Sequence, residues 1–244
     1  LLLSPRRVAA RAAAERMAAM LGEKPGETIG YLTRLDSKRS AKTRVTVLTE
    51  AIFLNRIVAD PELPGVSAVL FDEAHERHLD SDFGLALALE TQGVLREDLR
   101  LLVMSATLDG ERFAGLMNDC PVIESEGRSH PLRIEWLGAS GTQRFEDAMA
   151  DAVAQAWRAE EGDILAFLPG VREIERVRER LEDRLRGAVI LPLHGQVDPA
   201  GQRAAIRRDA DGGRRIVLAT AIAETSLTLD GVTVVVDGGL SRRA

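Results

Sequence analysis

Short apolar runs alternate along the chain with longer polar stretches of helical character. The runs lie at residues 45–48, 67–71, 99–104, 163–168, 189–193, 215–219 and 232–236, and they consist largely of Val, Leu, Ile and Ala. Runs of this length are typical of strands buried on both faces of a parallel sheet. Amphipathic helical patterns occupy the intervening segments 8–21, 51–58, 80–95, 110–117, 144–159, 171–185 and 199–210. The alternation predicts βαβ units and an α/β fold with parallel sheets.

A polar segment, Glu124 to Pro131, interrupts this alternation. We interpret residues 125–131 as an inter-domain linker, which leaves a first α/β lobe at 1–124 and a second at 132–244. The second lobe is expected to begin with a strand at 132–137, where apolar and polar residues alternate. Residues 1–3 resemble the back half of a strand, and the chain stops in the loop after residues 232–236. We therefore expect a fragment in which both lobes are incomplete.

The composition is that of an ordinary globular protein, with 45% hydrophobic residues, 29% charged residues and a net charge of −6. A groove can be locally basic on an acidic protein, so this charge does not exclude a nucleic-acid partner. One basic stretch, which could equally be a solvated loop, contains Arg34, Lys38, Arg39, Lys42 and Arg44. The single Cys120 excludes an internal disulfide and a cysteine-based zinc cluster. No apolar run approaches the ~20 residues of a membrane span, so a cytoplasmic protein without a membrane partner is expected.

Two adjacent carboxylates follow the apolar run at 67–71: Asp72 and Glu73, with His75 two residues later. Ligands of open α/β sheets gather where parallel strands end. Asp72 could hold Mg²⁺ through water, while Glu73 could orient and deprotonate a water that attacks a phosphate. The alternative is that both acids simply favour the start of a helix, where carboxylates suit the helix dipole. His75 and His78 lack the spacing and the cysteine support of a zinc site.

Several further motifs occur at the ends of the predicted strands, in a fixed order along the chain. They are Pro5-Arg6-Arg7-Val8-Ala9-Ala10, Thr49-Glu50, Asp72-Glu73-Ala74-His75-Glu76-Arg77, Ser105-Ala106-Thr107, Phe167-Leu168-Pro169-Gly170, Leu193-His194-Gly195 and Ala219-Thr220 to Thr225-Ser226. The series resembles the DEAH-box group of superfamily 2 helicases, and especially its bacterial HrpB-type members. Each motif is weak alone, but seven in this order cover almost the whole chain.

The resemblance implies two RecA-like lobes, with ATP and Mg²⁺ as cofactors. It also implies nucleic acid as the partner, with single-stranded RNA favoured over DNA. Asp72 and Glu73 would take the magnesium and water-activating roles, and Asp230 would reach the nucleotide from the second lobe. His75, Ser105 and Thr107 would couple nucleotide state to lobe movement. The residues implied to contact nucleic acid are Arg6, Arg7, Thr49, Glu50, Thr220, Thr225 and Ser226. The implied activity is ATP-dependent translocation along nucleic acid and its unwinding.

Three departures from the family pattern limit what the chain alone is expected to do. Ala51 stands where the family usually has glycine. The chain contains no G-x-x-x-x-G-K-[ST] phosphate cradle and no Gln-Arg-x-Gly-Arg-x-Gly-Arg arginine-finger motif. We therefore expect residues 1–244 alone to be inactive. The alternatives are a non-catalytic helicase-like module that binds nucleic acid or protein, and a translocase on double-stranded DNA.

Overall fold

The computed structural model describes residues 1–106, 110–125, 127, 130–138, 141–208, 213–223 and 229–241. They form two compact units, Leu1–Arg128 and Ser129–Ala244, each with its own sheet and core. Both units are α/β with parallel strands flanked by helices, which confirms the predicted fold class. No helix in the described part of the chain has the length and hydropathy needed to cross a bilayer.

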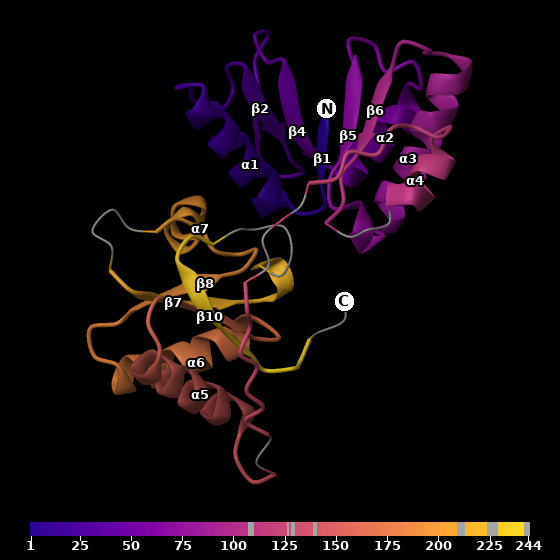
Figure 1. The fold of residues 1–244 in the computed structure, drawn as a ribbon. Helices are drawn as coiled ribbons and strands as arrows, with labels where there is room; N and C mark the ends of the chain where they lie inside the picture. Colours follow the sequence, from indigo (N-terminus) through magenta and orange to yellow (C-terminus); the bar gives the residue numbers. More distant parts are fainter. Residues whose placement is uncertain are drawn as a thin grey trace. The chain divides into compact units, whose positions relative to one another are not determined.

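The first unit contains a sheet of six strands in the order β3-β2-β4-β1-β5-β6 (Figure 1). The strands are β1 (Leu2–Ser4), β2 (Ile29–Leu32), β3 (Ser37–Lys38), β4 (Val45–Thr49), β5 (Ala68–Phe71) and β6 (Arg100–Val103). Every described pairing is parallel except that of β2 with β3. The carboxyl ends of β4, β1, β5 and β6 therefore lie side by side at one edge of the sheet.

Helices cover the two faces of this sheet. They are α1 (Arg7–Met20), α2 (Glu50–Ala59), α3 (Leu79–Val94) and α4 (Gly110–Leu116), with a 3₁₀ turn η1 (Ala74–Glu76) before α3. The Ala-rich side of α1 packs on β2 and β4, because small side chains let that helix lie close to the sheet. On the other face, α2 and α3 bury a larger core that includes Phe53, Phe71 and Leu85.

Strands β2 and β3 were not predicted from the sequence, which indicated only a basic stretch at 34–44 in this part of the chain. A Cβ atom at Gly30 in β2 would lie 2.5 Å from the carbonyl oxygen of Lys38 in β3. The glycine is therefore required for the two backbones to approach, yet it weakens the strand signal in the sequence.

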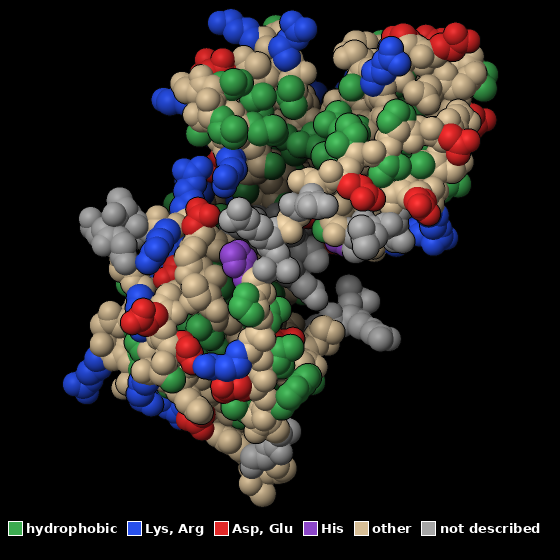
Figure 2. Space-filling view, viewed as in Figure 1, with side chains coloured by type: hydrophobic (Ala, Val, Ile, Leu, Met, Phe, Trp, Pro, Cys, Tyr) green, Lys and Arg blue, Asp and Glu red, His purple; other side chains and the backbone are tan. Residues whose placement is uncertain are grey.

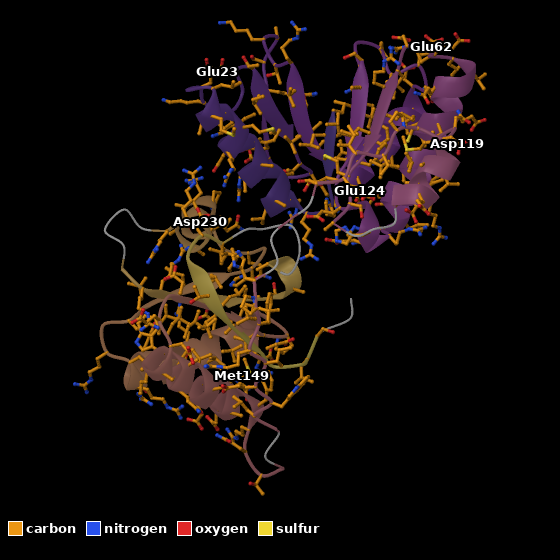
Figure 3. The ribbon with its side chains drawn as sticks, viewed as in Figure 1. Glu23, Glu62, Asp119, Glu124, Met149 and Asp230 are labelled. Carbon is orange, nitrogen blue, oxygen red and sulfur yellow. The ribbon has the colours of Figure 1, made fainter. Side chains whose placement is uncertain are left out.

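The second unit contains a four-stranded parallel sheet in the order β10-β7-β9-β8. Its strands are β7 (Asp163–Phe167), β8 (Val189–Leu193), β9 (Arg215–Ala219) and β10 (Val232–Asp237), and its helices are α5 (Phe145–Ala159), α6 (Val171–Arg184) and α7 (Pro199–Ile206), with a 3₁₀ turn η2 (Ala221–Ala223). Helices α5 and α6 pack on one face and α7 on the other. Met149 of α5, labelled in Figure 3, belongs to the first of these cores.

The strand predicted at 132–137 is not formed, and that prediction was wrong. Residues 130–138 have no regular structure, and Leu132, Ile134 and Trp136 are 87%, 70% and 91% exposed. Alternating apolar positions make a strand only where a neighbouring strand supplies backbone hydrogen bonds. No strand pairs with this segment within the described residues.

Candidate active site

The predicted site residues of the first unit lie at the carboxyl edge of its sheet, at the ends of four adjacent strands. Arg6 follows β1, Asp72 and Glu73 follow β5, and Ser105 follows β6, while Thr49 and Glu50 join β4 to α2. Arg7 is the first, exposed residue of α1. Residues up to 99 positions apart in sequence thus meet at one edge, as expected for a ligand site of an α/β sheet.

Asp72 and Glu73 begin a tight turn that is hydrogen-bonded to the segment after the neighbouring strand β6. The Glu73 backbone N–H donates to Asp72 Oδ1 at 3.0 Å, and the Ala74 N–H donates to the Met104 carbonyl oxygen at 3.0 Å. Glu73 and Arg77, which flank η1, have φ values of 54° and 52°. Non-glycine residues in this left-handed region cost of the order of 1 kcal/mol or more each. Surrounding contacts must therefore hold the turn, and strain of this kind is concentrated at functional sites.

Burial sets the protonation preferences of both carboxyl groups. It raises the pKa of Asp72, and burial together with the neighbouring Asp72 charge raises the pKa of Glu73. A glutamate with a raised pKa is a better proton acceptor near neutral pH than an ordinary one. Asp72 supplies hard oxygen atoms of the kind that Mg²⁺ prefers. In the described part of the chain no three His, Cys, Asp or Glu side chains are grouped to hold a metal.

His75 lies between Glu73 and the loop that follows β6. Its Nδ1 accepts a hydrogen bond from the Ala106 N–H at 3.3 Å, and its Nε2 lies 3.4 Å from Glu73 Oε2. Because Nδ1 accepts, the ring proton of a neutral His75 sits on Nε2 and points at the Glu73 carboxylate. The histidine therefore connects Glu73 to the Ser105–Ala106 segment. Thr107, the remaining coupling residue of the prediction, lies outside the described residues.

Glu76 and His78 also belong to this cluster, although the sequence analysis assigned neither a role. His78 Nδ1 lies 3.3 Å from Glu50 Oε2 and its Nε2 lies 3.1 Å from Glu76 Oε2. The same Glu76 oxygen is 3.8 Å from Arg6 NH2. The two histidines thus face different carboxylates and do not converge on one metal. The only feature of the sequence that could have indicated a role for Glu76 and His78 was the high density of ionisable residues between positions 72 and 78.

The basic stretch at 34–44 is divided between the two edges of the sheet. Arg34 lies in the turn after β2, at the carboxyl edge, whereas Lys42 and Arg44 precede β4 and lie at the amino edge. The view in Figure 2 shows Lys and Arg side chains at the end of the first unit remote from its strand tips. The stretch is therefore not one continuous patch beside Asp72.

In the second unit, Thr220 and His194 lie at the carboxyl edge of the sheet. The Thr220 N–H donates to the Leu193 carbonyl oxygen at 3.3 Å, which places the ends of β9 and β8 together. His194 Nδ1 accepts from the Gln196 N–H at 3.3 Å, and burial lowers the pKa of this histidine. Pro169 and Gly170 follow β7 at the same edge. Thr225 and Ser226, also predicted to contact nucleic acid, lie outside the described residues.

Asp230 lies at the opposite edge of the second sheet, just before β10 begins. Figure 3 labels it close to α7. Its carbonyl oxygen accepts from Arg215 NH2 at 2.9 Å, while its side chain is exposed. The structure therefore does not bring Asp230 together with Thr220.

Comparison with known proteins agrees with the motif order. Residues 146–243 match the family model described as helicase conserved C-terminal domain. The chain is 49% identical over its whole length to the ATP-dependent RNA helicase HrpB of Escherichia coli, and it spans 30% of that protein. It is 39% identical over 98% of its length to the ATP-dependent RNA helicase HrpA of the same organism, of which it spans 18%.

Solved structures give the same result for the fold. A crystal structure of the E. coli DEAH/RHA helicase HrpB superposes with a TM-score of 0.92, at 48% identity, over 100% of this chain and 31% of that one. A second crystal structure, of the E. coli DExH-box NTPase HrpB, matches with a TM-score of 0.79 over 100% of this chain and 30% of that one. Sequence and fold thus agree that all 244 residues are similar to the E. coli DEAH/RHA helicase HrpB, of which they span less than a third.

Proposed function

We propose that the native protein containing residues 1–244 is an ATP-dependent RNA helicase that couples ATP hydrolysis to movement along single-stranded RNA and to unwinding. The observation that carries this proposal is the contact of His75 with both Glu73 and the Ala106 N–H, at the tip of β5 beside Asp72. It supplies a candidate base together with a direct connection to a neighbouring strand tip.

In this proposal, Glu73 accepts the proton of the attacking water, and His75 holds the Glu73 carboxylate in place. Asp72 holds Mg²⁺ through water, and the ion when bound supplies charge compensation for the phosphates. Arg6, Arg7, Thr49 and Glu50 contact the nucleic acid from the first unit. Thr220, Thr225 and Ser226 contact it from the second unit, Ser105 and Thr107 take part in coupling, and Asp230 contacts the nucleotide.

Hydroxyl groups and guanidinium groups bind phosphates without identifying the base, which suits a motor that moves along any sequence. Both relatives are named RNA helicases, which favours RNA over DNA as the nucleic acid along which the protein moves. The assignment of residues 1–124 and 132–244 to two lobes around a linker at 125–131 is part of the same proposal, as is a cytoplasmic location.

The test is ATP hydrolysis by the native protein with no nucleic acid, with single-stranded RNA, and with DNA of the same sequence. We expect stimulation by RNA that exceeds stimulation by DNA. Glu73→Gln should retain ATP binding and lower turnover by a factor of about 10² or more, the lower range for loss of a general base. Glu90→Gln is the matched control, because Glu90 is exposed on α3. Near wild-type turnover by Glu73→Gln would refute Glu73 as the base, and RNA binding without any ATPase activity would favour a non-catalytic module.

A further inference from the structure

His78 joins two carboxylates that come from different parts of the first unit. Glu50 is the first residue of α2, and Glu76 is the last residue of η1. The two ring nitrogens of His78 lie 3.3 Å and 3.1 Å from one oxygen of each. The side chains of both glutamates are only 9% exposed, whereas that of His78 is 40% exposed. Carboxylates this far removed from water need hydrogen-bond donors from the protein.

One side chain serves two carboxylates in this arrangement. A neutral imidazole carries one N–H, so it can donate to only one of two carboxylates. Both nitrogens of His78 face carboxylate oxygens, so the two glutamates share this ring. The contact of each glutamate with His78 therefore depends on the contact of the other. Burial raises the pKa of Glu50, and the Ser81 side chain hydrogen-bonds to the same carboxyl group.

Each end of this bridge leads to a different part of the candidate site. Glu50 adjoins Thr49 at the tip of β4, and Glu76 lies 3.8 Å from the Arg6 guanidinium at the tip of β1. The Glu76 backbone N–H donates to the Glu73 carbonyl oxygen at 2.9 Å. One contiguous series of contacts thus runs from residues assigned to nucleic acid, through His78 and Glu76, to the backbone of the residue assigned as the base.

We propose that His78 is a positioning residue that couples nucleic-acid contact at Arg6 and Glu50 to the orientation of Glu73, through Glu76. The inference rests on the proposed function. A phosphate that approaches Arg6 attracts its guanidinium group away from Glu76. Glu76 then loses its contact with Arg6 and keeps that with His78, and the turn that carries Glu73 moves with it. In this scheme His78 contacts neither the nucleotide nor the water that attacks the phosphate. Its loss therefore affects stimulation by RNA and not the basal reaction.

The test is the ratio of RNA-stimulated to basal ATPase activity of the native protein that contains these residues. His78 occupies the N-cap position of α3, and asparagine is a favourable N-cap. His78→Asn therefore preserves the start of the helix but cannot reach both carboxylates. We expect its stimulation ratio to fall by a factor of about 3 to 30, the range for coupling carried by contact networks. Basal activity should remain within about twofold of wild type, since no group assigned to chemistry is removed.

The matched control is Leu79→Ala, because Leu79 is the adjacent residue and 81% exposed. Its stimulation ratio should equal that of wild type. Glu76→Gln should lower the ratio as His78→Asn does, and the double variant should show no further fall, because both changes break one bridge. Thermal unfolding of each variant shows whether it is folded, and His78→Ala provides a second test should Asn find a new partner.

The outcomes separate the two proposals. A stimulation ratio for His78→Asn equal to that of wild type overturns the role of His78 while leaving the helicase proposal intact. The same holds for equal losses of basal and stimulated activity, which indicate a purely structural role. Absence of RNA stimulation in the wild-type protein overturns the proposed function itself, and the coupling role with it.

Discussion

Arg215 and Asp163 form a buried ion pair in the second unit, with Arg215 Nε 2.9 Å from Asp163 Oδ2 and side chains that are 3% and 0% exposed. The Arg215 guanidinium also donates to the carbonyl oxygens of Ala204, Ile206, Arg207 and Asp230. One side chain therefore joins the starts of β7 and β9 to the end of α7 and to the segment before β10.

Removal of Arg215 should destabilise the second unit strongly. Arg215→Leu leaves the Asp163 charge buried without its ion-pair partner, which typically costs about 3–5 kcal/mol. Arg184→Leu is the control, because the pair of Arg184 with Asp151 is largely exposed and contributes about 0–1 kcal/mol. Trp136 and Trp157 are the only tryptophans and both lie in this unit, so tryptophan fluorescence during urea unfolding reports on it. Equal stabilities of the two variants would contradict the prediction.

Tyr31 in β2 should show an abnormally high pKa. Burial, together with the hydrogen bond from its hydroxyl to Asp36 Oδ2 at 2.6 Å, raises the pKa of Tyr31 to about 12. A folded-state pKa above the unfolded value of about 10 means that the contribution to stability is complete below pH ~10 and is lost as pH rises toward 12. It is the only tyrosine, so tyrosinate absorbance of the intact chain titrates this group alone. A midpoint near 10 in the folded protein would contradict the prediction.

The strained turn after β5 predicts a difference between glycine and alanine at position 77. Arg77 has φ 52°, and glycine adopts this conformation without the cost of a Cβ atom. Both substitutions remove the ion pair of Arg77 with Asp82 at 2.8 Å, so that loss cancels in the comparison. Arg77→Gly should be more stable than Arg77→Ala by about 1 kcal/mol. Urea unfolding followed by circular dichroism measures this difference, and equal stability of the two variants would argue against strain at this residue.

Phe53 should be essential to the first core. It is fully buried, and its ring meets that of Phe71 edge-on with 5.6 Å between centroids. Phe53→Ala should cost about 3–5 kcal/mol, since it removes a large buried ring and leaves a cavity. Phe83 on α3 is 50% exposed, so Phe83→Ala is the matched control and should cost much less. Because Phe71 immediately precedes Asp72, the first variant should also lower ATPase activity in the native protein.

Much of the architecture followed from local pattern. The strands ending before Asp72, at Phe167 and at Ala219 are dense apolar runs, and the helices between them have clear polar faces. These features act within a few residues, so sequence alone reveals them. Strand β2 was not predicted because it contains Gly30, which weakens the strand pattern. The glycine is required by the close approach of the Lys38 backbone, which the local sequence pattern does not reveal. Segment 132–137 has the pattern of a strand but no partner among the described residues.

The candidate site likewise has features that the sequence indicated and features that only the folded structure showed. The order of the motifs along the chain was sufficient to indicate the family and to single out Asp72, Glu73 and His75, because residue types and their spacing are properties of the linear chain. Only the folded chain showed that His78 lies between Glu50 and Glu76 and that Asp230 lies at the opposite sheet edge from Thr220. Such relationships depend on which strands are neighbours and on where side chains point. Contacts between distant segments decide both, and no local pattern records them.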